Sequence, residues 1–404
     1  MTPLFRKFLG LNWPLILTMT MLLSFGVYAI YNASAFREAA DLAIKWRQQV
    51  HWIALGAGLM LVASLMDYKW VRWACLPMYL AGIAGLIYLQ LKGVEINGNK
   101  NWVIIGGISM QPSQFAITAG IVMLAVVFGE LPRIWSIFNN HFLRIAVGGL
   151  IVGVPAILVI KEDLGSGLVW GPVFLAMLVA GNIPFRYIIS LILGVLCIIP
   201  VVYFFVLKPY QRARIDQTWY LLTNQSEKVD TSGHGWVPNF VQIAVASAGF
   251  EGKGPMSEKV PEGRSIHRMF YPEAEAFSDY IFSVICEEFG FRGSAVLLTC
   301  IALLLIQTIV VAFQSRDQVG RLLVVGIVAM FFAHTFQNAG MNLCMLPVIG
   351  LPMPFISYGG TFMLVTLFLM GMVQSVWIHR HISPVPVGAA HRSRSAQRDR
   401  EEAD

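Results

Sequence analysis

Long apolar runs separated by short polar segments make up most of the chain. A run of about 17 to 25 apolar residues is long enough to cross about 30 Å of hydrocarbon as a helix. Ten runs approach or reach this length, at residues 13–30, 50–66, 73–91, 111–129, 145–160, 164–183, 187–207, 280–313, 322–346 and 355–378. The pattern predicts an all-α integral membrane protein with ten transmembrane helices.

Composition excludes a water-soluble globular protein. Hydrophobic residues make up 56% of the chain and charged residues 13%, and the mean hydropathy is +0.65, whereas soluble domains are about one quarter charged. Arg6 and Lys7 precede the first run, and basic residues are commoner in the loops that would share their side. The positive-inside rule therefore places both termini in the cytoplasm. The alternative, a cleaved signal peptide ending near Ala35, is disfavoured by the length of the first run and by the nine that follow.

Two segments are not membrane-like. Residues 382–404 are polar and rich in Arg, and we expect a disordered cytoplasmic tail after a polytopic membrane domain of residues 1–381. Residues 208–277 form a large extracytoplasmic loop between helices 7 and 8, with an apolar stretch at 240–250. A loop of this length is usually functional. The apolar stretch favours a segment that lies on the bilayer or covers a cavity.

The five cysteines all lie in predicted spans and lack metal-ligand spacing. They are interpreted as small apolar packing residues, and neither a disulfide framework nor a metal site is predicted.

Ionisable residues inside spans are costly, so each one suggests a function. Glu288 and Arg292 are four residues apart and are expected to form a neutralising pair on one helix face. Asp279 has no cationic residue within four positions, and it shares a helical stripe with Ser283 and Glu287. A carboxyl group in that setting is expected to have a raised pKa, as a general base or proton carrier requires. The alternative is that Asp279 only caps the helix N-terminus.

Several motifs jointly resemble one family. They occur in family order between about residue 97 and residue 375. They are QPS at 111–113, DLGS at 163–166, YQRARI at 210–215, GKG at 252–254, SDYIF at 278–282, EEFG at 287–290 and PFISYGG at 354–360. Together they are similar to the signature of the SEDS proteins (shape, elongation, division and sporulation), and residues 340–360 resemble the RodA-like branch more than the FtsW-like branch.

The resemblance implies a ten-helix bacterial inner-membrane protein with peptidoglycan glycosyltransferase activity. Such an enzyme polymerises lipid II into β-1,4 glycan strands for cell-wall elongation, releases undecaprenyl pyrophosphate, and works with a class B penicillin-binding protein that crosslinks the strands. The catalytic aspartate of the family falls on Asp279, which would act as general base. A division role of the FtsW type is the alternative within the family.

The resemblance also suggests substrate-binding residues. Arg212, Arg214 and Lys253 are the candidates to hold the pyrophosphate, because cationic side chains suit phosphate oxygens. For the two arginines the alternative is a lipid headgroup or a Glu partner. Glu275, Trp102 and Ser357 are further candidates, although Trp102 also fits an interface anchor. No metal ligands are predicted, but family members are compatible with a divalent cation (Mg2+ or Mn2+).

The chain departs from the family pattern at several positions. Gln114 and Ile117 stand where the family usually has Glu and Lys, and losing both charges together avoids an uncompensated buried ion. The residues before Asp279 also differ, so Glu275 is assigned to the motif only by gapless register. Asn101 replaces a common Arg, and Trp236 and Val237 replace Tyr and Gln. Asp279 itself is unaffected.

Two other functions fit part of the sequence. A lipid II flippase or proton-coupled transporter would also use buried acids, but a carrier needs a site reachable from both faces. Most unusual polar residues here lie at or beyond the outer boundary, which favours the enzyme. A non-catalytic scaffold that activates its partner is the third reading.

Overall fold

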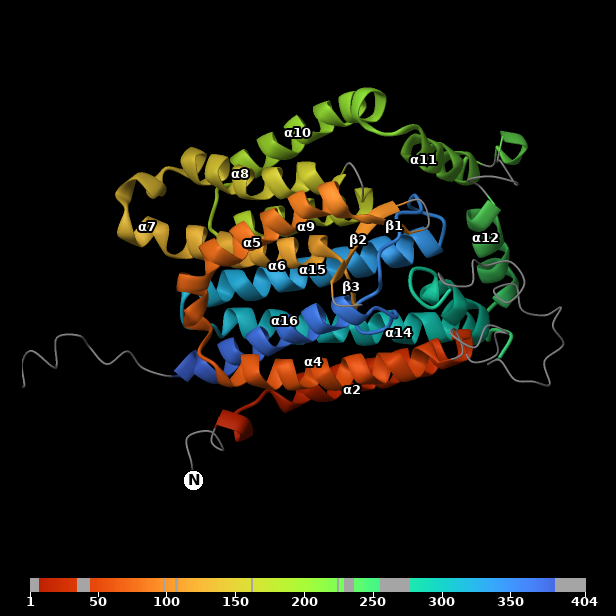
Figure 1. The fold of residues 1–404 in the computed structure, drawn as a ribbon, viewed down its shortest axis with the longest axis horizontal. Helices are drawn as coiled ribbons and strands as arrows, with labels where there is room; N and C mark the ends of the chain where they lie inside the picture. The colour runs from red at the N-terminus through yellow and green to blue at the C-terminus, as the bar shows by residue number, and fades with distance from the viewer. Residues whose placement is uncertain are drawn as a thin grey trace, which may run out of the picture.

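The computed structural model describes residues 7–34, 44–96, 99–105, 108–160, 163–223, 225–228, 236–254 and 276–381. Long helices lie side by side in a bundle, with a small sheet and shorter helices at one end (Figure 1). The helices of the bundle are α2 (Trp13–Ser34), α4 (Lys45–Leu65), α5 (Val71–Lys92), α6 (Pro112–Gly129), α8 (His141–Ile160), α9 (Leu164–Ala180), α10 (Phe185–Val201), α14 (Ile281–Phe313), α15 (Gln318–Asn342) and α16 (Gly360–Ile378).

The described residues contain nine helices that are long and apolar enough to cross a membrane. The remaining bundle helix, α9, is apolar but has only 17 residues. The π-helical turn η3 (Val202–Val206) extends α10. Each predicted run overlaps one of these helices, so a helical membrane protein is confirmed, while a count of ten spans stays a prediction.

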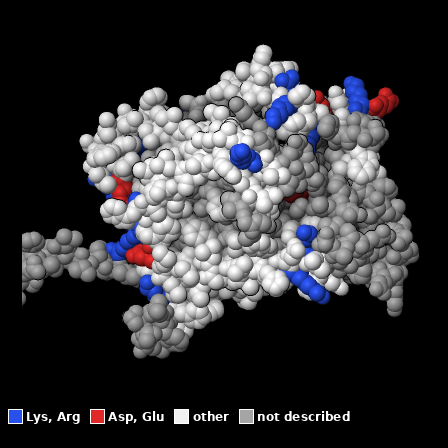
Figure 2. Space-filling model, in the orientation of Figure 1, with Lys and Arg blue, Asp and Glu red and all other residues white. Residues whose placement is uncertain are grey.

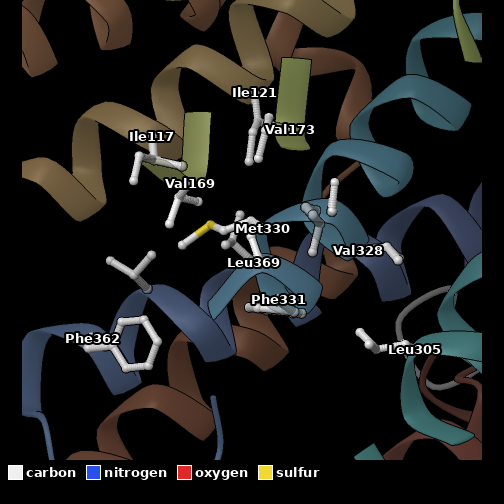
Figure 3. Packing of buried hydrophobic residues seen from close by; sticks show 14 of the residues in the cluster. Ile117, Ile121, Val169, Val173, Leu305, Val328, Met330, Phe331, Phe362 and Leu369 are labelled. Atoms are coloured by element: carbon white, nitrogen blue, oxygen red, sulfur yellow. The ribbon is translucent and has the colours of Figure 1, made fainter. Parts of the chain in front are cut away.

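Helices α6, α9, α15 and α16 form the centre of the bundle. Ile117, Val169, Met330 and Leu369, one from each helix, are fully buried and lie close together (Figure 3). Helix α10 is different, because Ile188 is its only buried residue and it lies at the edge of the bundle (Figure 1). Its exposed apolar side chains suit a lipid environment, because lipid tails are as apolar as the side chains themselves.

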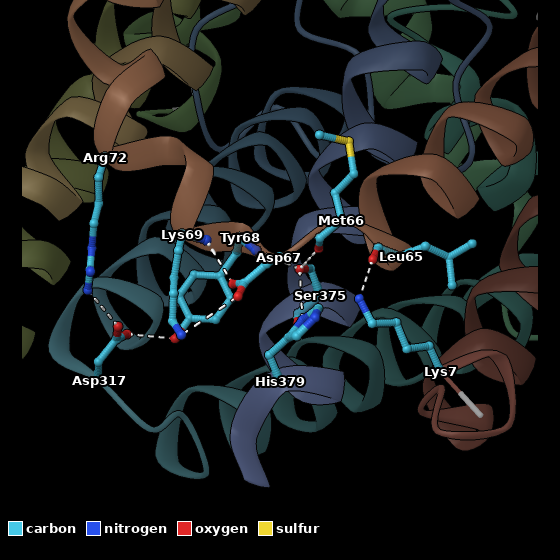
Figure 4. A network of polar contacts seen from close by, with 10 residues as sticks. All are labelled: Lys7, Leu65, Met66, Asp67, Tyr68, Lys69, Arg72, Asp317, Ser375 and His379. Carbon is cyan, nitrogen blue, oxygen red and sulfur yellow. Dashed lines mark hydrogen bonds and ion pairs between the residues drawn. The ribbon is translucent and has the colours of Figure 1, made fainter. Parts of the chain in front are cut away.

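Most charged side chains visible in Figure 2 lie toward the two ends of the bundle, with a basic side chain also near the middle of the view, and the rest of the described surface is largely uncharged. At one end, Asp317 links three parts of the chain (Figure 4). Its carboxylate accepts hydrogen bonds from Tyr68 (2.8 Å) and from Arg72 (3.0 Å), and Arg72 also pairs with Glu130 at 2.7 Å. These contacts connect η1 (Tyr68–Trp70) and α5 to the start of α15. We call this end of the bundle the Asp317 end.

The other end, which we call the Asp279 end, carries the small sheet. Strands β1 (Val94–Ile96), β2 (Asn99–Ile105) and β3 (Ile108–Met110) pair antiparallel in the order β1-β2-β3. The sequence predicted an all-α fold, so the sheet is a correction. Strands this short contain too few residues to show a clear alternation of polar and apolar positions.

The shorter helices complete the described chain. The segment after α10 folds as α11 (Pro209–Leu222), η4 (Ser226–Lys228) and α12 (Trp236–Ala248). The buried apolar residues of α12 pack against α14, and a role on the bilayer or over a cavity stays a prediction. At or near the Asp317 end lie α7 (Leu131–Ile134), η2 (Ser136–Asn139) and η6 (His379–His381). The tail at 382–404 lies outside the described residues.

The expected pairing of Glu288 with Arg292 is wrong. Helix α14 is broken at Gly290, whose φ of 61° and ψ of −161° are not helical. The spacing of four residues therefore does not place the two side chains on one face. Glu288 is buried and accepts a hydrogen bond from Asn32 at 3.0 Å, whereas Arg292 is exposed.

Candidate active site

Two asparagines from the last turns of α15 fix the backbone of Asp279. The side-chain amides of Asn338 and Asn342 donate to the Asp279 carbonyl at 2.9 Å and 3.0 Å. The Asn342 oxygen in turn accepts from the Ser283 amide at 3.2 Å. Helix α14 begins after Tyr280, which occupies the N-cap position without a side-chain cap bond. Asp279 is thus held just outside the helix, which does not favour the capping alternative.

The PFISYGG loop between α15 and α16 holds the same segment from a second side. The Ser357 hydroxyl donates to the Ser278 carbonyl at 2.7 Å, and the Tyr358 amide donates to the Phe277 carbonyl at 2.9 Å. Ser357 also accepts from the Met353 amide at 2.7 Å, which closes the loop on itself. This motif therefore shapes the site, and Ser357 serves as a support for Ser278.

Gly350 lies directly against the Asp279 carboxylate. A Cβ atom at position 350 would be 3.0 Å from Asp279 Oδ2, and Gly350 has a φ of +54°. Glycine adopts this left-handed conformation without steric cost. Asp279 is half-buried, and its carboxylate lies against the backbone of Gly350, which has no side chain.

Gly350→Ala is expected to lower any activity that depends on Asp279 by about tenfold or more, because the added methyl group displaces the carboxylate. The left-handed backbone also costs about 1–2 kcal/mol with a Cβ present. Gly194→Ala is the control, since a Cβ added at Gly194 in α10 meets open space. Equal activities of the two variants in a steady-state assay would contradict the role of Gly350.

Asp163 anchors the far side of the loop. Asp163 is the N-cap of α9. Its carboxylate accepts hydrogen bonds from the Ser166 backbone amide (3.1 Å), the Ser166 hydroxyl (2.6 Å) and the Gln111 side-chain amide (3.1 Å). Burial raises the pKa of Asp163, and these hydrogen bonds oppose the rise. A Cβ on Gly165 would lie 2.5 Å from the Ile349 carbonyl, so the DLGS turn and the loop are in contact. Asp163 is best explained as a structural acid.

The three candidate cations lie in different environments. Arg214 donates to the Val348 carbonyl at 3.3 Å, two residues from Gly350. Arg212 donates to the carbonyls of Leu207 (3.1 Å) and Phe204 (2.7 Å), at the end of η3. Lys253 forms an ion pair with Glu287 at 2.7 Å. Of the three, Arg214 contacts the loop beside Asp279.

Residues that the sequence analysis did not single out also build the site. Gln49 donates to the Ser357 carbonyl at 3.2 Å and accepts from the Gly359 amide at 3.3 Å. The Lys45 amine lies 5.5 Å from the centre of the Tyr358 ring. Asn338 and Asn342 were missed as site residues because only ionisable groups in spans were weighed. Uncharged amides within apolar runs were the available signal.

The other candidates are less directly connected. Trp102 is half-buried on β2, where it pairs with Val94, and Glu275 lies outside the described residues. Gln114 and Ile117 are fully buried in α6. Within the described chain, the side-chain amide of Gln114 has no hydrogen-bond partner. Both replacements are neutral, so the departure leaves no buried charge at these positions.

The described residues contain no group of three or more His, Cys, Asp or Glu side chains that could hold a metal ion. A divalent cation (Mg2+ or Mn2+) stays a prediction. Mg2+ is commonly bound through one or two carboxylates together with substrate phosphates.

A family model described as cell cycle protein, FtsW/RodA/SpoVE, matches residues 13–382. The chain belongs to this family. These are the SEDS proteins that the motifs indicated, and relatives named for both branches match. A protein of Geobacter metallireducens named probable peptidoglycan glycosyltransferase FtsW is 32% identical, over 90% of this chain and 93% of its own length. The peptidoglycan glycosyltransferase RodA of Treponema pallidum is 26% identical, over 90% and 97%.

Solved structures show the same SEDS fold. RodA of Thermus thermophilus matches with a TM-score of 0.63 at 20% identity, over 92% of this chain and 98% of its own. A chain from a study of polymerization and crosslinking by a peptidoglycan synthase complex matches with a TM-score of 0.72 at 23% identity, over 92% and 99%. The helical membrane architecture is therefore shared across the family.

Proposed function

We propose that this SEDS protein is a peptidoglycan glycosyltransferase that polymerises lipid II into β-1,4 glycan strands. The observation that carries the proposal is the placement of Asp279. Its carboxylate is half-buried at one end of the bundle, its backbone is fixed by two asparagines, and it lies against the family's signature loop. A fixed carboxylate with access to its surroundings is what a general base requires.

The reaction needs one base and one site for a departing anion. Asp279 accepts the proton of the acceptor sugar's 4-hydroxyl while that oxygen attacks the anomeric carbon of the donor. The bond from that carbon to undecaprenyl pyrophosphate breaks, and the pyrophosphate leaves with the electron pair. The change from an α to a β linkage fits a single displacement, for which one essential carboxylate suffices.

Arg214 is the cation best placed to hold the pyrophosphate. It contacts the backbone two residues from Gly350, which itself touches Asp279. A guanidinium group pairs well with phosphate oxygens and stabilises negative charge as it develops. Arg212 instead binds the carbonyls at the end of η3.

Arg214→Ala is expected to lower kcat/KM for lipid II by about tenfold to a hundredfold, because a charge-assisted contact to the leaving group is lost. Arg212→Ala, the matched control, is expected to stay within about threefold of wild type. The measurement is steady-state polymerisation by each purified variant. A larger loss for Arg212 than for Arg214 would reverse the assignment.

The remaining features of the proposal follow from the family. We assign the protein to the bacterial inner membrane, with both termini in the cytoplasm and the Asp279 end outward. A class B penicillin-binding protein is the proposed partner, in keeping with a structural neighbour from a synthase complex. The RodA-like signature at 340–360 supports a role in elongation rather than division.

A transporter is the main competing function, since buried acids also occur in carriers. Among the described residues of the bundle helices, however, every Asp, Glu, Lys and Arg lies in a first or last turn, except for Glu287, Glu288 and Arg292, which flank the break in α14. A carrier is expected to place its site near the bilayer midplane. The distribution of charge therefore favours an enzyme that acts at one face.

The decisive experiment combines purified protein, its partner and lipid II in vesicles. We expect polymer on the face where Asp279 lies, with no net transfer of lipid II between leaflets. Translocation without polymer would establish the flippase instead. Stimulation of the partner without polymerisation by this chain would establish the scaffold.

A further inference from the structure

The segment that follows α12 inserts into the break in α14. Gly290 interrupts the helix, and residues 249–254 lie against residues 287–292. Four backbone hydrogen bonds join the two segments. They run from Lys253 N to Glu287 O (2.9 Å), Gly254 N to Glu288 O (2.9 Å), Phe291 N to Gly249 O (3.0 Å) and Arg292 N to Phe250 O (3.1 Å). We call this arrangement the clamp.

Two glycines allow the backbones to approach this closely. A Cβ on Gly252 would lie 2.3 Å from the Glu288 carbonyl oxygen, and a Cβ on Gly290 would lie 2.4 Å from the Gly252 nitrogen. Both residues also have positive φ, at +81° and +61°. The glycines of GKG and EEFG are therefore explained by packing and backbone conformation, with no contact to a ligand required.

An ion pair closes the clamp. Lys253 Nζ lies 2.7 Å from Glu287 Oε1, and the exposed fractions of the two side chains are 24% and 2%. Little water screens an ion pair this deeply placed, so the attraction is stronger than at an exposed surface. The adjacent Glu288 is tied to α2 by Asn32. The first part of α14 is thus held from two sides.

The clamp and Asp279 are connected by one short stretch of helix. Residues 281–289 precede the break, and Asp279 lies two residues before their start. This stretch spans only about 13 Å at 1.5 Å per residue. Asn342 fixes its beginning through Ser283, and the clamp fixes its end. A change at the clamp therefore moves the base of the site.

We propose that Lys253 is a positioning residue, which acts through its ion pair with Glu287 to hold residues 281–289 and hence the Asp279 carboxylate in place. This assigns to Lys253 a role other than the pyrophosphate contact that the motif suggested. The catalytic consequence rests on the proposed function, whereas the mechanical role of the clamp does not.

The test begins with the single variants Lys253→Met and Glu287→Gln and the double variant K253M/E287Q. Each single variant leaves one charge of the pair without its partner and can fail to fold, whereas the double variant removes both charges. We expect each folded variant to lose about tenfold or more in kcat, with KM for lipid II within about twofold of wild type. Arg292→Gln is the control, because it keeps the backbone bond from Arg292 N to Phe250 O and changes only an exposed side chain. A raised KM at unchanged kcat would overturn the proposal.

A disulfide separates positioning from phosphate binding. The Lys253 and Glu287 backbones are directly hydrogen-bonded, a separation that suits a disulfide. In K253C/E287C, with Cys286→Ala to prevent mispairing, we expect oxidation to restore most of the activity and reduction to remove it. The oxidised form carries no cation at position 253, so its inactivity at a preserved fold would overturn the proposal.

Hydrogen exchange provides a readout independent of polymerisation. Amides of residues 281–289 are expected to exchange at least about tenfold faster in K253M/E287Q than in wild type. If exchange rises while wild-type protein makes no polymer, the proposed function fails and the clamp stands. If exchange does not rise, the clamp is wrong whatever reaction the protein catalyses.

Discussion

Asp279→Asn is expected to reduce polymerisation of lipid II to about one thousandth of the wild-type rate, because an amide cannot accept the proton of the attacking hydroxyl. The substitution preserves the size of the side chain. It also preserves the contacts of Asn338 and Asn342, which bind the main-chain carbonyl of residue 279 rather than its side chain. The loss should therefore appear in kcat, with lipid II binding and the unfolding temperature nearly unchanged.

Asp216→Asn is the matched control, since it makes the same change at another acid, which lies in α11. The Asp216 carboxylate accepts a hydrogen bond from Tyr203 at 2.5 Å. That variant is expected to retain at least about half of the activity. Product is measured as polymer length and amount on gels, with the protein in complex with its partner. Wild-type rates from Asp279→Asn would remove the base from the mechanism.

Asn342→Leu is expected to cause the second largest effect. Asn342 donates to the Asp279 carbonyl and accepts from the Ser283 amide, so leucine removes two buried hydrogen bonds. The Asp279 carbonyl keeps its bond from Asn338, and the Ser283 amide keeps its bond to the Tyr280 carbonyl. We expect a loss of about 1–3 kcal/mol in the free energy of unfolding. A shift of the base by about 1 Å is expected to cost about a hundredfold in kcat.

Gln318→Leu provides the comparison for that variant. Gln318 lies at the opposite end of α15 and donates to the Ala180 carbonyl at 2.7 Å, so leucine there removes one side-chain hydrogen bond of the same kind. Thermal unfolding and steady-state rates are measured for both proteins. If Asn342 positions the base, Asn342→Leu loses about as much stability as Gln318→Leu but a much larger part of its rate. Equal losses of rate in the two variants would refute the positioning role.

The clamp changes the meaning of two motifs. From the sequence, Lys253 of GKG was a candidate to hold the pyrophosphate, and EEFG was one of the motifs that resemble the family. In the structure, Gly252 and Gly290 instead bring two backbones into contact, and Lys253 neutralises Glu287. We therefore expect Lys253 to be needed for activity without touching the substrate.

The sequence alone determined the membrane-spanning architecture, since a hydrocarbon layer imposes helices of a fixed minimum length and the apolar runs record that length directly. It also identified Asp279 as an acid at the boundary of a span with no cationic residue within four positions along the chain. The break at Gly290 was invisible, because one apolar run continues through it from Ile281 to Phe313.

Only the tertiary structure decided what surrounds Asp279. Asn338 and Asn342 are about sixty residues away in the chain, as the hydrogen-bond separations of 59 and 63 show, and Gly350 comes from a different loop. Apolar patterning reports which residues avoid water, but it carries no information about which polar side chains from separate helices meet. The partners of a buried polar group are set by helix packing, and for this reason Arg214, Arg212 and Lys253 could be assigned different roles only once their contacts were seen.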